Sequence, residues 1–140
     1  MNFTFHYLLM ANHLMLQKHF FHRIKELKLT LGQPKVLDYL QQNNGAMQKD
    51  IAKGCHIEPA SLSTILNGME KHGLITRNID KQNRRNINIF MTEKGKEIYK
   101  QIEQEFIAIE KKAFYNFSEK EVNQLTEYMI RLHNNLEEPL

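Results

Sequence analysis

A basic segment of nine residues is the first feature of this sequence that could do chemistry. Residues 77–85, RNIDKQNRR, hold three arginines and one lysine against a single acid, Asp80. The net charge of the 140-residue chain is only +3, so this segment accounts for all of it and the rest of the chain balances. Turns favour Gly, Asn and Asp, and folding alone gives no reason for so much like charge. The segment is either a solvated charged turn or a site for a polyanion, and the concentration of charge favours the polyanion.

A polar helix is predicted just before the basic segment. In PASLSTILNGMEKHG, residues 59–73, the apolar side chains form one stripe at helical spacing: Leu62, Ile65, Leu66 and Met69. Short side chains on the other side keep a helix slim enough for a DNA major groove about 12 Å wide. Those outward positions are Pro59, Ala60, Ser61, Ser63, Thr64, Asn67, Gly68 and Lys71. A plain surface helix fits the same residues, but a basic loop two strands further on favours helix and loop acting together on DNA.

The elements around these residues are predicted from periodicity and capping signals. Residues 1–29 predict a helix with apolar side chains around most of its girth. Thr30 and Gln33 predict a capping box for the next helix, with Pro34 in its first turn. Residues 47–55 and 59–72 predict a helix-turn-helix that ends at Gly73. Alternating residues in 74–79 and 86–91 predict two strands, with the basic loop between them.

Two helices are predicted to finish the chain. The first begins at Glu93 and has one apolar face, with Ile98, Ile102, Phe106, Ile109 and Ala113. A capping box of Ser118 and Glu121 opens the second helix. Its apolar residues then step by three and four along a seam, which is typical of a helix that packs against other helices. The seam consists of Val122, Leu125, Met129, Leu132 and Leu136.

In this order and spacing, the motifs resemble the MarR family of bacterial winged-helix transcription regulators along nearly the whole chain. MQKDIAKGCHIEPASLSTILNGMEKHGLITR is similar to the family's helix-turn-helix, and RNIDKQNRRNINIFMTEKGKEI resembles its wing. The wing motif, R-x-x-D-P-x-D-R-R and then L-T-x-x-G, is matched at Arg77, Asp80, Arg84, Arg85, Thr92 and Gly95. Lys81 replaces the proline, Asn83 replaces the second aspartate, and Thr64 stands where an arginine is frequent. Because Asn83 offers Arg85 no ion pair, the resemblance implies a looser wing. Because Thr64 stands in place of an arginine, it also implies less direct base reading from the helix.

The resemblance implies a mainly α (α+β) fold in a single domain of residues 1–140. Residues 30–92 would form the winged helix-turn-helix lobe, and residues 1–29 and 93–140 would form dimerisation helices. In a homodimer on a palindromic operator in double-stranded DNA, Ser61, Ser63, Thr64, Asn67 and Lys71 would face the major groove. The wing residues Lys81, Asn83, Arg84 and Arg85 would lie at the flanking minor groove, and Gln48 and Lys49 would contact phosphates.

The function implied is a repressor whose DNA binding is relieved by a small aromatic ligand. Family members bind such ligands between the dimer helices and the DNA-binding lobe. Aromatic residues of the first helix and Tyr39 could line that pocket or belong to the core, and the sequence leaves both open. The main alternative is a winged helix that serves as a protein-interaction module, which would tolerate loss of the wing charge.

Other classes of function have weaker support. A metal-responsive regulator is suggested only by four early histidines, His6, His13, His19 and His22, without a nearby cysteine or carboxylate cluster; we predict no metal and no other cofactor. Cys55 is the only cysteine, and we expect a buried side chain. Phosphate-loop, nucleophile-elbow and H-E-x-x-H motifs are missing, which argues against an enzyme. With no signal-peptide pattern and no apolar run of about 20 residues, we expect a cytoplasmic protein without membrane contact.

Overall fold

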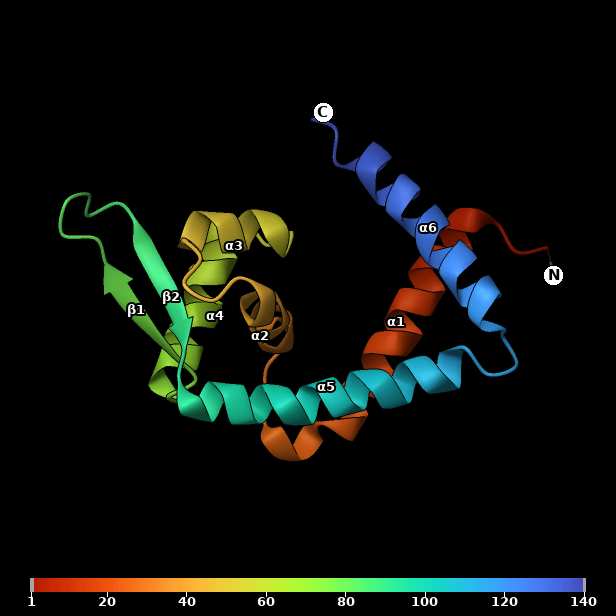
Figure 1. The fold of residues 1–140 in the computed structure, drawn as a ribbon, viewed down its shortest axis with the longest axis horizontal. Coiled ribbons are helices and arrows are strands. Elements are labelled where there is room, and N and C mark those ends of the chain that lie inside the picture. The colour runs from red at the N-terminus through yellow and green to blue at the C-terminus, as the bar shows by residue number, and fades with distance from the viewer. Residues whose placement is uncertain (1, 140) are drawn as a thin grey trace. The chain divides into compact units, whose positions relative to one another are not determined.

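The computed structural model describes residues 2–139 and is mainly helical, with one small antiparallel sheet (Figure 1). The helices are α1 (Phe5–Arg23), a 3-10 turn (Lys25–Leu27), α2 (Gln33–Gln42), α3 (Gln48–Gly54), α4 (Pro59–Lys71), α5 (Glu93–Ala113) and α6 (Glu119–Leu136). The strands are β1 (Ile75–Ile79) and β2 (Ile87–Met91). Contacts divide the chain into two compact units, residues 1–106 and 107–140. This order of elements confirms the predicted winged helix-turn-helix fold.

The structure confirms a first helix but shortens it, because α1 covers Phe5–Arg23 instead of the predicted 1–29 and a separate 3-10 turn, Lys25–Leu27, follows it. The Thr4 side chain caps it by accepting a hydrogen bond from the Tyr7 amide at 3.3 Å. Phe20 is its one buried residue and stacks on Phe106 of α5 with ring centroids 4.3 Å apart. Arg23 forms an ion pair with Glu105 beside that stack. The C-terminal half of α1 is therefore fastened to α5 within the first unit.

The predicted capping box before α2 is only half formed. The Thr30 amide donates to Gln33 Oε1 at 3.1 Å, but the N-cap of α2 is Gly32, and it makes no side-chain capping bond. Gly32 has φ of +97°, a left-handed conformation that breaks the run between Thr30 and the helix. Thr30 therefore lies two residues before the N-cap position, too early for its side chain to act as the cap. Pro34 does lie in the first turn of α2, as predicted.

Helices α3 and α4 form the predicted helix-turn-helix over a common core. The core residues of the two helices include Ile51, Leu62, Leu66 and Met69, each with no exposed surface. Pro59 opens α4 after Glu58, whose side chain makes no capping bond. Gly73 follows the helix end with φ of +74°, which ends α4 where the sequence predicts. A Cβ on Gly68 would lie 3.2 Å from Gln33 Nε2, so this glycine permits close packing of α4 on α2.

Strands β1 and β2 pair antiparallel in the register Ile75↔Met91 to Ile79↔Ile87. Ile89 and Met91 are buried, which confirms the predicted inward face of β2. A bridge between Met47 and Asn88 adds a short third segment beside β2, just before α3 begins. In Figure 1 the hairpin projects from the helices of the lobe and carries its loop at the tip.

The hairpin is joined to α5 by close backbone packing. Thr92 caps α5 by accepting from the Gly95 amide at 3.0 Å, and its hydroxyl donates to the Gly73 carbonyl. A Cβ on Gly95 would lie 2.2 Å from the Leu74 carbonyl oxygen, so only glycine fits this contact. Further along α5, the buried Tyr99 hydroxyl donates to Asp38 Oδ1 of α2 at 2.9 Å. The start of α5 is thus fixed to the lobe at two points.

The second unit holds the end of α5 and all of α6. The predicted capping box is complete: Ser118 Oγ accepts from the Glu121 amide at 3.1 Å and Glu121 Oε1 accepts from the Ser118 amide at 3.0 Å. These bonds hold the pKa of the Glu121 carboxyl below its ordinary value. None of the apolar residues in the predicted seam of α6 is buried. None of the helices described for residues 2–139 combines the length and apolar character required to cross a bilayer.

Candidate nucleic-acid interface

The outward face of α4 is the side opposite its buried stripe. A helix turns by about 100° per residue, so Ala60, Thr64, Asn67 and Lys71 share the direction that faces away from Leu62 and Met69. All four outward residues are exposed, and so is Ser61 at the edge of the face. The predicted recognition residues Ser61, Thr64, Asn67 and Lys71 therefore lie together on one accessible surface. The Thr64 hydroxyl donates to the Ala60 carbonyl at 3.4 Å.

Ser63 lies apart from that surface, in a polar contact between three elements. It is half-buried, and its hydroxyl accepts from Gln48 Nε2 of α3 at 3.0 Å. Its backbone carbonyl accepts from Arg77 Nη2 of β1 at 3.3 Å. Ser63 therefore connects α4 to both α3 and β1. Gln48 is half-buried and faces Ser63, whereas Lys49, the residue after Gln48, is exposed.

The contact around Ser63 leaves two buried polar atoms without a partner. Gln48 Oε1 and Arg77 Nε are buried, and neither finds a hydrogen-bond partner among residues 2–139. Such atoms are unfavourable in a protein interior. The hydrogen bonds that the same two side chains donate to Ser63 are therefore more important for the stability of this contact. From the sequence, Arg77 was expected only to contribute to the wing motif and its charge. Its position two residues after the buried Ile75 is the sequence signal for an inward side chain.

The wing is a hydrogen-bonded turn with two accessible arginines. The Asp80 amide donates to the Asn86 carbonyl at 3.0 Å, and Asp80 Oδ1 accepts from the Gln82 amide at 2.9 Å. Asn83 Oδ1 accepts from the Arg85 amide at 3.1 Å, so Asn83 organises the backbone of the turn. Lys81, Asn83, Arg84 and Arg85 are all exposed. Over the described residues, neither Arg84 nor Arg85 forms an ion pair.

Cys55 lies behind this surface, in the turn between α3 and α4. It is 5% exposed, and its thiol donates to the Lys35 carbonyl at 3.7 Å. Burial raises the pKa of the Cys55 thiol to about 11. The predicted burial of Cys55 is thus confirmed, and the thiol is neutral at physiological pH.

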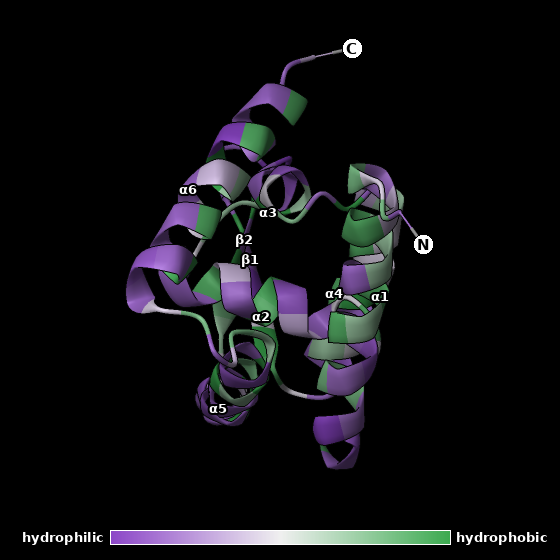
Figure 2. Cartoon of the chain, turned by 90° about the vertical axis from the view of Figure 1, so that its right-hand side faces the viewer, coloured by the Kyte–Doolittle hydropathy of each residue, from purple (hydrophilic) through white to green (hydrophobic). Residues whose placement is uncertain are grey.

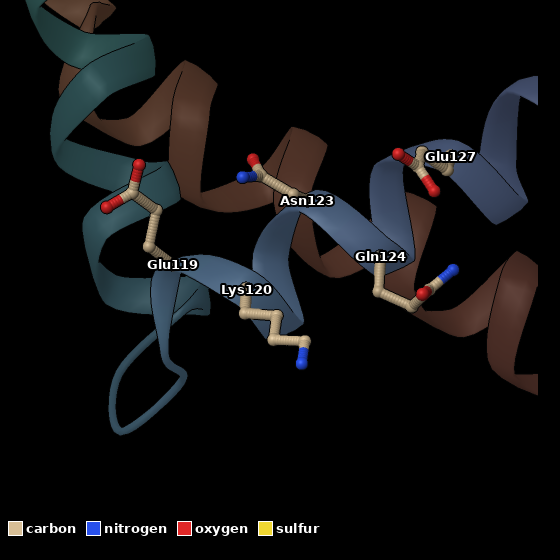
Figure 3. A pocket seen from close by; sticks show the side chains of 5 residues that line it. All are labelled: Glu119, Lys120, Asn123, Gln124 and Glu127. Atoms are coloured by element: carbon tan, nitrogen blue, oxygen red, sulfur yellow. The ribbon is translucent and has the colours of Figure 1, made fainter.

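The other residues raised by the sequence lie outside the α4–wing surface. The four histidines of α1 are exposed. The ring of the half-buried Tyr39 packs against the exposed Gly54 of α3, since a Cβ on Gly54 would lie 2.3 Å from Tyr39 Cε2. An open depression on α6 is lined by residues that all carry polar or charged groups (Figure 3). It is lined by Glu119, Lys120, Asn123, Gln124 and Glu127.

Comparisons with known proteins agree with this geometry. The family model described as MarR family matches residues 29–87, which include the helix-turn-helix and most of the hairpin. The chain is 27% identical over 113 residues to the HTH-type transcriptional regulator YybA of Bacillus subtilis strain 168, covering 81% of this chain and 75% of YybA.

Two solved structures of DNA complexes are similar to the chain. The complex of S. aureus MepR with DNA has a TM-score of 0.80 and 29% identity, covering 96% of this chain and 98% of MepR. A transcriptional regulator of Listeria monocytogenes assigned to the MarR family, complexed with 26mer DNA, has a TM-score of 0.87 and 28% identity, covering 97% and 90%. With the family match and the predicted motifs in place, the chain belongs to the MarR family and is a transcription regulator, not an enzyme.

Proposed function

We propose that this regulator is a homodimer that binds a palindromic operator in double-stranded DNA and acts as a repressor in the cytoplasm. The observation that carries the proposal is the pair of surfaces in the first unit: a slim polar face on α4 and unpaired arginines at the tip of the wing. The S. aureus and Listeria monocytogenes relatives were solved with DNA, which supports the same partner here. A cytoplasmic location follows from the location of bacterial DNA.

The outward residues of α4 are proposed to enter the major groove. Ser61, Thr64 and Asn67 are short enough for the helix to approach base edges, and Lys71 in the last turn would reach a phosphate. Lys49 is exposed near the start of α3 and is proposed to contact another phosphate. We assign Gln48 and Ser63 a positioning role in addition, because each already holds the other at 3.0 Å.

The wing is proposed to lie at the flanking minor groove. Arg84 and Arg85 would insert there, since a narrow minor groove has an enhanced negative potential. Lys81 would contribute a phosphate contact beside them. Asn83 would act through the backbone of Arg85, which it holds at 3.1 Å, rather than by pairing with the guanidinium.

The homodimer is supported by apolar side chains that the single chain leaves exposed. On α1, Met10 is 65% exposed and Leu14 63%, and on α6, Tyr128 is 54% and Ile130 53% exposed. Figure 2 shows hydrophobic residues recurring along both helices. Monomeric proteins rarely expose this much apolar surface on whole elements. A second copy that covers these helices would give a two-fold dimer, and a two-fold dimer fits a palindromic site.

The proposed relief of DNA binding by a small ligand depends on the distance between the two α4 helices of the dimer. A dimer that reads two half-sites needs its two α4 helices about one DNA turn apart. A ligand that binds better to another spacing shifts the population away from the DNA-competent one. The resemblance to the family supports a small aromatic ligand for this role.

The test is a salt series of duplex binding measured by fluorescence anisotropy. Arg84→Ala/Arg85→Ala removes two exposed cations from each wing, and Lys96→Ala/Lys100→Ala removes the same charge from exposed positions on α5. The slope of log affinity against log salt should flatten by about one unit for each lost phosphate-type contact, so by about two units per wing in the first variant. The α5 variant should keep the slope of the wild type.

Identical slopes for the wild type and the wing variant would overturn the DNA role of the wing. Binding that is weak and independent of the wing charge would instead favour the protein-interaction module. Equal losses in both double variants would mean that net charge, and not the wing, determines affinity.

A further inference from the structure

Before Lys71, the outward face of α4 carries none of the side chains that most often read guanine. From Pro59 to Asn67 the accessible residues are small or neutral, and no Arg or Lys occurs among them. Arg and Lys are the common partners of guanine O6 and N7 in the major groove. Lys71 is the first cation on this face, and at about 1.5 Å of rise per residue it lies about 6 Å beyond Asn67. The part of α4 nearest the groove is therefore poorly suited to G·C pairs.

Between Pro59 and Asn67, Asn67 is the accessible side chain whose amide can make two hydrogen bonds to one base. The Asn67 side chain is exposed on the face of α4 opposite the buried stripe, and its amide has no hydrogen-bond partner among the described residues. An asparagine amide offers one acceptor and a donor group, which match adenine N6–H and N7. Guanine presents two acceptors at the same edge, so the amide carbonyl would face another acceptor there.

The neighbours of Asn67 suit thymine. The Thr64 hydroxyl already donates to the Ala60 carbonyl at 3.4 Å. Thr64 therefore retains acceptor capacity and its methyl group for a partner, and Ala60 offers only a methyl group. Both lie on the outward face, about one turn apart. Ala and Thr methyl groups make apolar contacts with the C5-methyl of thymine.

The helix that carries these groups is held rigidly, as base reading requires. Next to Asn67, Gly68 packs closely on Gln33, which is 4% exposed and bonded to the Thr30 amide. On the other side, Ser63 is bonded to both α3 and β1. The backbone of α4 is therefore fixed against three elements around the position of Asn67.

We propose that each half-site is A·T-rich under α4 and that Asn67 reads an adenine there, with the methyl groups of Ala60 and Thr64 against thymine. This inference rests on the proposed DNA function and adds the class of sequence that is read. The wing favours the same composition at the flanks, because Arg84 and Arg85 gain most from the narrow minor groove of A-tracts.

The experiment begins with selection of bound duplexes from a pool with about two randomised helical turns. The selected half-sites should show A·T pairs beneath α4 and an adenine at one fixed position. Replacing that A·T pair by G·C should weaken wild-type binding ~10–100-fold. Asn67→Ala should weaken binding to the A·T site by a similar factor and should no longer distinguish the two sites. Gln41→Ala, which also removes an exposed amide but lies on α2, is the control and should behave like the wild type.

Modified bases then identify the groove that is read. Diaminopurine·T keeps the major-groove pattern of A·T and changes the minor groove, whereas inosine·C does the reverse. At the Asn67 position, diaminopurine·T should preserve affinity and inosine·C should lose it. At the wing positions the opposite result is expected.

The outcomes separate this inference from the proposed function. If no duplex in the pool is retained, the proposed function fails. If duplexes are retained with G·C pairs under α4, or if Asn67→Ala still distinguishes A·T from G·C, the proposed function stands and the adenine reading is overturned.

Discussion

Ser63→Ala is expected to destabilise the fold even though the substitution improves helix propensity. The Ser63 hydroxyl accepts from Gln48 Nε2 at 3.0 Å, while Gln48 Oε1 is already buried without a partner. Removing the hydroxyl leaves the whole Gln48 amide unsatisfied, which typically costs about 1–3 kcal/mol. Alanine recovers roughly 0.5 kcal/mol over serine inside a helix. We therefore expect a net loss of about 0.5–2.5 kcal/mol.

Ser61→Ala is the matched control, because it makes the same replacement on the same helix at an exposed position. Its effect contains the propensity term without the buried amide, so the difference between the two variants isolates the contact with Gln48. Urea unfolding followed by circular dichroism at equal protein concentration measures both free energies of unfolding. The urea midpoint should fall for Ser63→Ala at an unchanged slope.

A double variant tests the cause of the loss. Gln48→Met/Ser63→Ala replaces both partners by apolar groups, so it should recover much of the stability that Ser63→Ala loses. The positioning role would be refuted if Ser63→Ala and Ser61→Ala differed by less than about 0.5 kcal/mol, the range of ordinary surface substitutions.

Two further predictions follow from the packing of the lobe. Gly95→Ala places a Cβ 2.2 Å from the Leu74 carbonyl oxygen, so urea unfolding should show a loss of at least about 1–3 kcal/mol, whereas the neighbouring exposed variant Lys96→Ala should stay near the wild type. Cys55 has a pKa raised from 9.0 to about 11 by burial, so its thiolate fraction at pH 8 falls ~100-fold. Iodoacetamide should alkylate the native protein at least that much more slowly than the urea-unfolded chain. Equal alkylation rates in native and unfolded protein would contradict the burial argument. Because the thiol of the unfolded chain loses its proton first, the free energy of unfolding should fall as the pH rises from about 9 toward 11. Cys55→Ala should remove this contribution to the pH dependence.

The elements were predictable because their signals are local. The stripe of Leu62, Leu66 and Met69 and the alternation of Ile87, Ile89 and Met91 each specify an element within a few residues, and the structure confirms both. The start of α2 was predicted less well, because the left-handed Gly32 separates Thr30 from the helix. A glycine in the sequence does not show which sign its φ will take.

The placement of Ser63 could not be predicted from the stripe. Ser63 lies at the border between the buried and outward faces of α4, where helical periodicity gives no decision. What decides is the approach of Gln48 and Arg77, which are 15 and 14 residues away in sequence. Contacts of this kind depend on how α3 and β1 pack, and only the tertiary structure supplies that information.

The separation of charge from shape on this surface implies that affinity and specificity have different origins. The wing holds the net positive charge, and charge contributes binding that depends on salt and ignores sequence. The outward face of α4 is neutral up to Lys71, so what it contributes is base reading that salt affects little. Raising the salt concentration should therefore weaken binding to every duplex while leaving the ratio between A·T and G·C half-sites nearly constant. Substitutions that loosen α4, such as Ser63→Ala, should do the opposite and reduce that ratio more than they change the salt slope.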